Sequence, residues 1–241
     1  MTDIHPLAAL ARRWSRHVEL TPRDRDALLA LPITRKPFAK DAYLVRQGQQ
    51  ATDCCLLLRG FAFRQKSLSD GRRQILSIQI ATEFVDLQNG PLRVADHSVQ
   101  SLDRCEVALI PIADILDLAA RHPNLRTAMW IDTLIDASIV REWLVNVGRR
   151  DARARLAHLL CELALRLEHV GAVRDGLITL PITQEQLADC TGLTAVHTNR
   201  TLQSLRRDGL IHFTNGILRV LDWTGLREAG DFDERYLHQQ A

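Results

Sequence analysis

The residues best suited to chemistry lie near the C-terminus, in a run of polar and cationic side chains that follows Thr194. An arginine can make paired hydrogen bonds to guanine, and an asparagine can do so to adenine. From Gly192 to Val220 the sequence holds four arginines and one acidic residue, although the net charge of the whole chain is only +2. We therefore expect any affinity for nucleic acid to come from this local patch.

Two short helices joined by a glycine turn are predicted to position these side chains. Thr183 can start the first helix, because its hydroxyl and the Gln186 amide can each bond a backbone N–H of the other residue. Gly192 allows a sharp turn, and Thr194 can cap the second helix. Asn215-Gly216 then joins two β-prone runs, which is a strong hairpin signal. These patterns predict a winged helix-turn-helix whose second helix enters a DNA major groove. The alternative is a helix pair that only packs a core.

Length and composition limit the remaining classes of protein. A chain of 241 residues suggests two domains with a sizeable core. Met1 to Arg16 shows no signal-peptide core, and no stretch is apolar enough to span a bilayer, so we expect a cytoplasmic location and no membrane partner. The five cysteines lack zinc-ligand spacing, which favours small buried thiols over disulfides or a metal site.

The predicted secondary structure changes along the chain from helices to strands and back to helices. Residues 4–31 are predicted to be helical, with Thr21-Pro22 at a helix start. From Arg35 to Ile110, short β-prone runs separated by turn residues predict a sandwich or barrel. The predicted domains are residues 1–123 with N-terminal helices and the β domain, residues 124–148 with a long helix and hinge, and residues 149–241 with the helix-turn-helix. We expect the acidic tail from Asp231 to fray.

The long helix, from Asn124 to about Val147, has apolar residues on more than one face. One face can pack on the β domain, and the other needs a second cover. A copy of the same helix across a two-fold axis is the economical cover, although the chain's own elements could also supply it. The predicted dimer contacts are Leu134, Ile135, Ile139 and Trp143. Gly148-Arg149-Arg150 is predicted to end the helix as a hinge.

The order of these parts resembles that of the Crp/Fnr family of bacterial transcription regulators. The similarity covers nearly the whole chain and is most specific from Ile182 to Ile211. It implies an α+β fold: an N-terminal, jelly-roll-like β-roll similar to cyclic-nucleotide-binding domains, a long dimerisation helix and a C-terminal winged helix-turn-helix. It also implies a regulator that is not an enzyme and carries no cofactor. The implied partners are double-stranded DNA, a second copy of the chain and, as a candidate, RNA polymerase.

Carried over by position, the resemblance assigns DNA reading to the second helix of the motif. Arg200 matches the family's base-reading arginine, and Thr183 matches a phosphate-contacting residue. Many members have a glutamate where this chain has Val196. We therefore expect the operator to differ at that base step, with a thymine methyl group in contact with the valine. The predicted DNA contacts are Thr183, Gln184, Thr194, Ala195, Val196, His197, Asn199, Arg200, Arg206 and Arg207.

The β-roll departs from the cyclic-nucleotide binders of the family. The cyclic-nucleotide binders carry a Gly-Glu pair followed by an Arg-Ser/Thr-Ala run. Alignment on Glu83-Phe84-Val85 places Asp86-Leu87 at the position of the Gly-Glu pair, and Ala95-Asp96-His97 stands at the position of the Arg-Ser/Thr-Ala run. An acid near the phosphate position without an arginine would repel the ligand, so we expect no cyclic AMP binding. An unknown small-molecule effector is predicted to meet Glu83, Asp86 and His97. His97 could also be a haem ligand, but a lone histidine is more often a surface or core residue.

Two other functions stay open on the sequence alone. A regulator with an inert β-roll would bind DNA without any ligand. A cupin-like metalloenzyme would need two or three histidines and a carboxylate on barrel strands, and the β segment contains only His97. The N-terminal cysteine cluster of the family's oxygen-sensing iron–sulfur members is also missing from the sequence. The leading hypothesis is a homodimeric, sequence-specific transcription regulator on a two-fold symmetric operator.

Overall fold

The computed structural model describes residues 5–239. The first residue of the predicted N-terminal helical segment and the outer ends of the first and last predicted domains, residues 1–4 and 240–241, lie outside the described residues. Two compact units make up the described chain, and we treat each by itself. The N-terminal unit comprises residues 5–66 and 78–137, and the C-terminal unit comprises residues 67–77 and 138–239. This division falls within the long helix, whereas the predicted boundaries follow residues 123 and 148.

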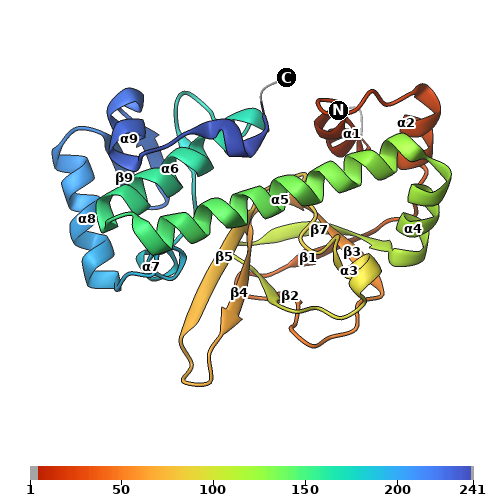
Figure 1. Ribbon diagram of the computed structural model, residues 1–241, viewed down its shortest axis with the longest axis horizontal. Coiled ribbons are helices and arrows are strands. Elements are labelled where there is room, and N and C mark those ends of the chain that lie inside the picture. Colours follow the sequence, from red (N-terminus) through yellow and green to blue (C-terminus); the bar gives the residue numbers. More distant parts are fainter. Residues whose placement is uncertain (1–4, 240–241) are drawn as a thin grey trace. The chain divides into compact units, whose positions relative to one another are not determined.

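The N-terminal unit is a roll of two antiparallel sheets with helices beside it (Figure 1). One sheet has the strand order β1-β7-β3 and the other β2-β6-β4-β5. The helices are α1 (Ala8–Trp14), α2 (Pro22–Leu29), α3 (Asn89–Leu92) and α4 (Ile112–Arg121). The strands are β1 (Thr34–Phe38), β2 (Tyr43–Val45), β3 (Asp53–Arg59), β4 (Ala62–Ser67), β5 (Arg73–Gln79), β6 (Ser98–Ser101) and β7 (Cys105–Pro111). The last residue of β4 and residues 73–77 of β5 are counted with the C-terminal unit. The predicted α+β fold with an N-terminal β-roll is confirmed.

The predicted N-terminal helical segment is two short helices. Thr21 starts α2 as expected: its hydroxyl accepts a hydrogen bond from the Asp24 backbone N–H at 3.2 Å, and the Asp24 carboxylate accepts one from the Thr21 N–H at 3.0 Å. Asp24 is itself buried, and the Asn124 amide donates to its carboxylate at 3.0 Å. This bond joins α2 to the start of the long helix.

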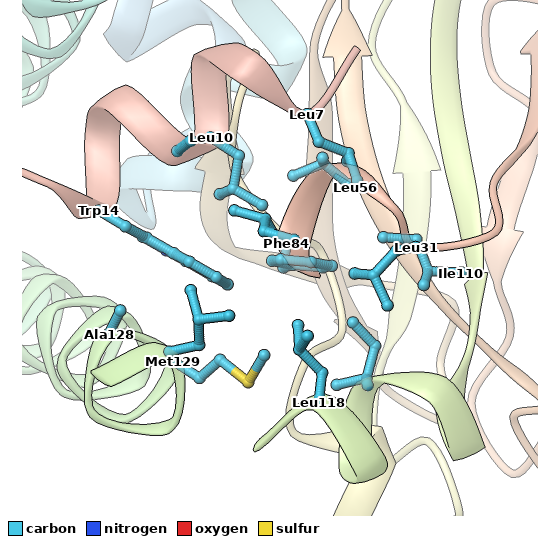
Figure 2. Close-up of a cluster of buried hydrophobic side chains, with 14 of the residues drawn as sticks. Leu7, Leu10, Trp14, Leu31, Leu56, Phe84, Ile110, Leu118, Ala128 and Met129 are labelled. Carbon is cyan, nitrogen blue, oxygen red and sulfur yellow. The ribbon is translucent and has the colours of Figure 1, made fainter. Parts of the chain in front are cut away.

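A large apolar cluster packs the helices of this unit against its β3 and β7 strands (Figure 2). Trp14 of α1 stacks on Phe84 with ring centroids 6.1 Å apart, and Met129 of the long helix lies in the same cluster. Cys54 belongs to this cluster, whereas its neighbour Cys55 belongs to a second cluster inside the roll. The two thiols therefore lie on opposite faces of β3, as strand alternation predicts.

The long helix, α5, runs without a break from Pro123 to Arg149. Gly148 lies inside it, and the chain leaves the helix at Arg150, the last residue of the predicted Gly148-Arg149-Arg150 hinge. Asp151 then caps the next helix, since its carboxylate accepts a hydrogen bond from the Ala154 N–H at 2.8 Å. Among residues 5–239, no helix has both the length and the apolar character needed to cross a membrane.

The C-terminal unit is a helical domain with a small three-stranded sheet of order β8-β10-β9. Its helices are α6 (Ala152–His169), α7 (Gln184–Thr191), α8 (Ala195–Arg207), α9 (Trp223–Gly230) and the 3-10 helix η1 (Glu234–Leu237). Its strands are β8 (Ile178–Thr179), β9 (Ile211–Thr214) and β10 (Ile217–Val220). The prediction that the tail frays from Asp231 is wrong for the described residues, because Phe232 and Leu237 are buried and the Tyr236 hydroxyl donates to the buried Glu162.

Candidate nucleic-acid interface

The helix-turn-helix has the capping geometry that its sequence predicts. The Thr183 hydroxyl accepts from the Gln186 backbone N–H at 3.1 Å, and the Gln186 side-chain oxygen accepts from the Thr183 N–H at 2.9 Å. Gly192 has a φ of +64°, and a Cβ atom there would lie 3.2 Å from a methyl carbon of Val147. Both the backbone conformation and the close approach therefore require a glycine at the turn.

An arginine outside the motif supports the turn. The Arg155 guanidinium of α6 donates to the carbonyl of Thr191, the last residue of α7, at 2.9 Å. It also donates to the carbonyl of Arg150 at 2.8 Å. Sequence reasoning missed this residue, because a single arginine in an amphipathic helix gives no signal of a bond to a carbonyl 36 residues away. It satisfies a carbonyl that the end of α7 would leave without a helical partner.

Helix α8 has a buried side and an exposed side. Thr194 caps it, since the threonine hydroxyl accepts from the His197 N–H at 3.2 Å. The buried side consists of Thr198, Thr201, Leu202 and Leu205. The exposed side begins at the N-terminus with Ala195, Val196 and His197, and Arg200 continues it one turn later. Val196 is 64% exposed, so its side chain is available to a partner.

The wing follows α8 as predicted. Strands β9 and β10 pair with Ile217 opposite Thr214, and the turn residues Asn215 and Gly216 have φ values of +53° and +73°. A two-residue hairpin loop with a type I′ turn requires a positive φ at both central residues. Arg219 is exposed on β10. The predicted hairpin at Asn215-Gly216 is confirmed.

The two arginines that end α8 have different surroundings. Arg207 is exposed, but Arg206 is partly buried and its guanidinium donates to the carbonyl of Phe213 in β9. Arg206 therefore holds the wing against α8, and its contact with DNA stays a prediction. Arg153 of α6 forms a further link, with its guanidinium 2.7 Å from Asp208 and 2.8 Å from the Ser204 hydroxyl.

The other predicted DNA contacts lie together on the surface formed by α7 and α8. Thr183 and Gln184 at the start of α7 are exposed, and so is Thr194 at the start of α8. Asn199 is partly exposed beside Arg200. The structure thus leaves every predicted contact at least partly open to solvent, with Asn199 and Arg206 the least exposed.

The four predicted dimer contacts fall into two groups. Leu134 and Ile135 are at least partly exposed, whereas Ile139 and Trp143 are buried within the chain itself. The Trp143 indole N–H donates to the buried Glu162 carboxylate at 2.9 Å. Ile139 and Trp143 are therefore covered by the chain's own elements and offer no free surface. The large exposed apolar side chains on α5 are Trp130, Leu134, Val140, Leu144 and Val145.

The three predicted effector residues also have different surroundings. Glu83 is partly buried and accepts from the Ile80 N–H at 3.0 Å. His97 is buried, with Nδ1 at 2.6 Å from the Asp96 carboxylate and Nε2 at 3.4 Å from the Gln88 amide. Burial, followed by the charge of Arg64, lowers the pKa of His97. Asp86 is buried and accepts from the Cys55 N–H at 2.6 Å.

An arginine does lie near the predicted effector residues, contrary to the expectation from the local alignment. Arg64 of β4 is buried, and its Nε donates to the carbonyl of Val85 at 3.0 Å. The same guanidinium forms an ion pair with Asp136 of α5. Its donors are thus occupied by the chain itself. No group of three or more histidine, cysteine or acidic side chains in residues 5–239 is arranged to hold a metal ion.

Comparison with known proteins places this architecture among transcription regulators. A family model described as a cyclic nucleotide-binding domain matches residues 35–122, and one described as a Crp-like helix-turn-helix domain matches residues 154–229. The transcriptional activator protein FnrL of Cereibacter sphaeroides is 30% identical over 174 residues, which cover 70% of this chain and 68% of FnrL. The nitrogen fixation regulation protein FixK of Azorhizobium caulinodans is 25% identical over 211 residues, 86% of this chain and 84% of FixK.

A solved structure supports the same fold. The structure of FixK2 from Bradyrhizobium japonicum superposes with a TM-score of 0.76 at 22% identity, covering 83% of this chain and 98% of that one. Both domain models match in the order that the fold requires, and FnrL shares sequence with this chain across both domains. The chain therefore belongs to the Crp/Fnr family of transcription regulators, and its helix-turn-helix is the DNA-binding domain of such a regulator.

Proposed function

We propose that the chain regulates transcription as a homodimer on a two-fold symmetric operator, with one α8 helix in each of two successive major grooves. Half-sites for such a pair are about 34–36 Å apart. The observation that carries this proposal is the exposed side of α8, where Val196, Asn199 and Arg200 follow a capped N-terminus without competing bonds to the rest of the domain in the described residues. RNA polymerase is a candidate further partner, and we expect a cytoplasmic, non-catalytic protein.

Each of the three reading residues suits a different base. Arg200 can bond guanine through two hydrogen bonds, and Asn199 can bond adenine in the same way. Val196 has no hydrogen-bonding group in its side chain, so it fits the methyl group of thymine. The operator is then expected to carry an A·T pair where relatives with a glutamate at this position would favour C·G.

Selection of bound sequences from a random DNA pool would reveal the operator, and gel shifts with Arg200→Ala would test the assignment. Loss of a bidentate arginine should cost about 1–3 kcal/mol and relax preference at one base pair. Arg219→Ala in the wing is the matched control, because loss of a phosphate contact should weaken all sequences alike. An Arg200→Ala variant that keeps the full operator preference would show that α8 does not read the bases.

The dimer is supported by a periodic stripe on α5. Trp130, Leu134, Ala137, Arg141, Leu144 and Gly148 are spaced alternately by four and three residues, which is the repeat of a two-helix seam. Trp130 is 68% exposed and Leu144 is 74% exposed, so both large side chains lack cover within the chain. We expect Leu144→Glu to give a monomer with weak operator binding in light scattering and gel shifts. Leu116→Glu on α4 replaces another exposed leucine and should leave the dimer intact.

Control by an effector at the β-roll is the favoured form of regulation, and the effector is not expected to be cyclic AMP. A ligand-independent regulator is the second candidate, and it is supported by the ion pair between Arg64 of β4 and Asp136 of α5, through which the chain's own side chains connect the roll to the long helix. Operator affinity of the protein as purified from its host, compared with that of refolded and ligand-stripped protein, separates these two forms. Equal affinities would favour the ligand-independent form.

A further inference from the structure

The N-terminal unit contains a cavity of about 180 Å³ between strands of its two sheets. Its apolar wall is supplied by strands of both sheets, through Phe38, Val45 and Leu109. Its polar part is formed by the loop before β3, by Asp53 at the start of β3 and by Asp86. Neither His97 nor Arg64 is among the described residues that line it, although the charge of Arg64 acts on Asp86.

Asp86 is the buried acid of this cavity, with 1% of its surface exposed. One carboxylate oxygen, Oδ1, accepts the Cys55 N–H, and in residues 5–239 no hydrogen bond to Oδ2 is found. Burial raises the pKa of Asp86 to about 7, against the opposing effects of the Cys55 N–H and the Arg64 charge. Asp86 is therefore only partly ionised at neutral pH, and an ammonium group beside Oδ2 would supply hydrogen-bond donors and favour the ionised form.

The charges around the cavity favour a cationic ligand over an anionic one. Asp53 and Asp86 contribute two acids, and among the described lining residues Lys36 supplies the one full positive charge. Lys36 is exposed, with its ammonium 5.0 Å from the centre of the Phe38 ring, so its charge is largely hydrated at the rim. An anion would meet the buried acid, whereas an amine would meet an acceptor.

The volume limits the size of the ligand. An apolar protein cavity of about 150 Å³ is known to hold benzene, which has six non-hydrogen atoms. A cavity of about 180 Å³ therefore fits a molecule of roughly six to eight non-hydrogen atoms. The wall of Phe38, Val45 and Leu109 suits a short hydrocarbon chain, and the far end meets Asp86.

We propose that this cavity binds a small organic amine, with its ammonium group at Asp86 and its apolar chain against Phe38, Val45 and Leu109. Amine binding at this site would extend the proposed sensor role of the roll. Only an effect of the amine on operator binding rests on that proposed function. Binding itself can be measured without DNA, so the two ideas can fail separately.

The test uses the full-length protein and n-pentylamine as the probe. Pentan-1-ol and pentanoate are neutral and anionic controls of similar size. The amine should raise the unfolding temperature with increasing concentration and give saturation-transfer NMR signals, because a ligand that binds the folded state stabilises it. The alcohol should bind about tenfold more weakly, and pentanoate should not bind.

Asp86→Asn keeps an oxygen for the Cys55 N–H and removes the charge, so it should weaken amine binding about tenfold or more. Asp114→Asn, on α4 and outside the cavity, is the matched control. If Asp86→Asn does not fold, Leu44→Trp at the cavity rim should block the amine instead. Equal binding of the amine and the alcohol, or unchanged amine binding by the Asp86→Asn and Leu44→Trp variants, would overturn the proposal. Gel shifts with and without the amine then test the sensor role separately.

Discussion

Replacing Tyr236 with phenylalanine removes one hydroxyl group from the C-terminal unit and keeps the ring. That hydroxyl donates to the Glu162 carboxylate at 2.9 Å and lies 3.1 Å from Nε2 of His158. Glu162 is fully buried, and its other donors are the Trp143 indole at 2.9 Å and the Arg166 guanidinium at 2.8 Å. Burial raises the pKa of Glu162, and these three donors, led by the charge of Arg166, oppose that rise.

The size of the effect follows from the charge of the acceptor. A hydrogen bond to a charged group contributes about 1.5–3 kcal/mol, and no water can replace the hydroxyl next to a carboxylate that is closed to solvent. For a unit of roughly 110 residues, 1 kcal/mol corresponds to roughly 4 °C in the unfolding temperature. We therefore expect Tyr236→Phe to lower the unfolding temperature of the C-terminal unit by about 6–12 °C.

Scanning calorimetry is the suitable assay, because two units can unfold in separate transitions. The chain has one other tyrosine, Tyr43, which is exposed and has no hydroxyl hydrogen bond within the described residues. Tyr43→Phe also removes a tyrosine hydroxyl and should change the free energy of unfolding of each unit by less than about 0.5 kcal/mol. Equal, small shifts for the two variants would refute the view that the tail stabilises the DNA-binding unit through Glu162.

Three further outcomes are expected. Arg206→Ala should lower the stability of the C-terminal unit by about 1–2 kcal/mol in urea unfolding, because it frees the Phe213 carbonyl, whereas Arg207→Ala should leave stability unchanged and weaken DNA binding at low salt. Gly192→Ala should cost about 1–3 kcal/mol in the same assay, because φ is positive there and a methyl group would approach Val147. Burial, followed by the charge of Arg150, lowers the pKa of His158 to about 4 from an ordinary 6.5. As the pH falls, His158 is protonated in the unfolded chain before it is protonated in the folded chain. The free energy of unfolding should therefore drop by about 3 kcal/mol between pH 6.5 and 4. The His158→Asn variant should lack this dependence on pH.

The features that could be predicted from the sequence are those determined by near neighbours in the chain. Thr21, Thr183 and Thr194 each cap a helix through a residue three positions later, so the signal and the bond lie in one short segment. Gly192 and Asn215-Gly216 are recognised because few other residues accept their backbone angles. The α+β fold followed from the change in texture between these segments.

The features that sequence analysis missed depend on partners far apart in the chain. Helical periodicity shows that α5 has two apolar faces, but it cannot say which face the chain covers itself, so the burial of Ile139 and Trp143 within one chain was not foreseen. Strand β1 was not predicted, since its sequence, Thr34–Phe38, contains two cations and a proline and is mostly exposed. The tail was expected to fray because the sequence around Tyr236 gives no signal of a hydrogen bond to Glu162, 74 residues away.

The burial of the thiols gives the protein a built-in reporter of local opening. All five cysteines are free and buried, and burial raises the pKa of each above its ordinary value. Native protein should therefore resist alkylating reagents and mild oxidants until a segment opens. Cys54, Cys55 and Cys105 would then time exposure of the N-terminal unit, while Cys161 and Cys190 would time the C-terminal unit. Mass spectrometry of peptides from the alkylated protein could follow thiol labelling in both units in one sample of the wild-type chain.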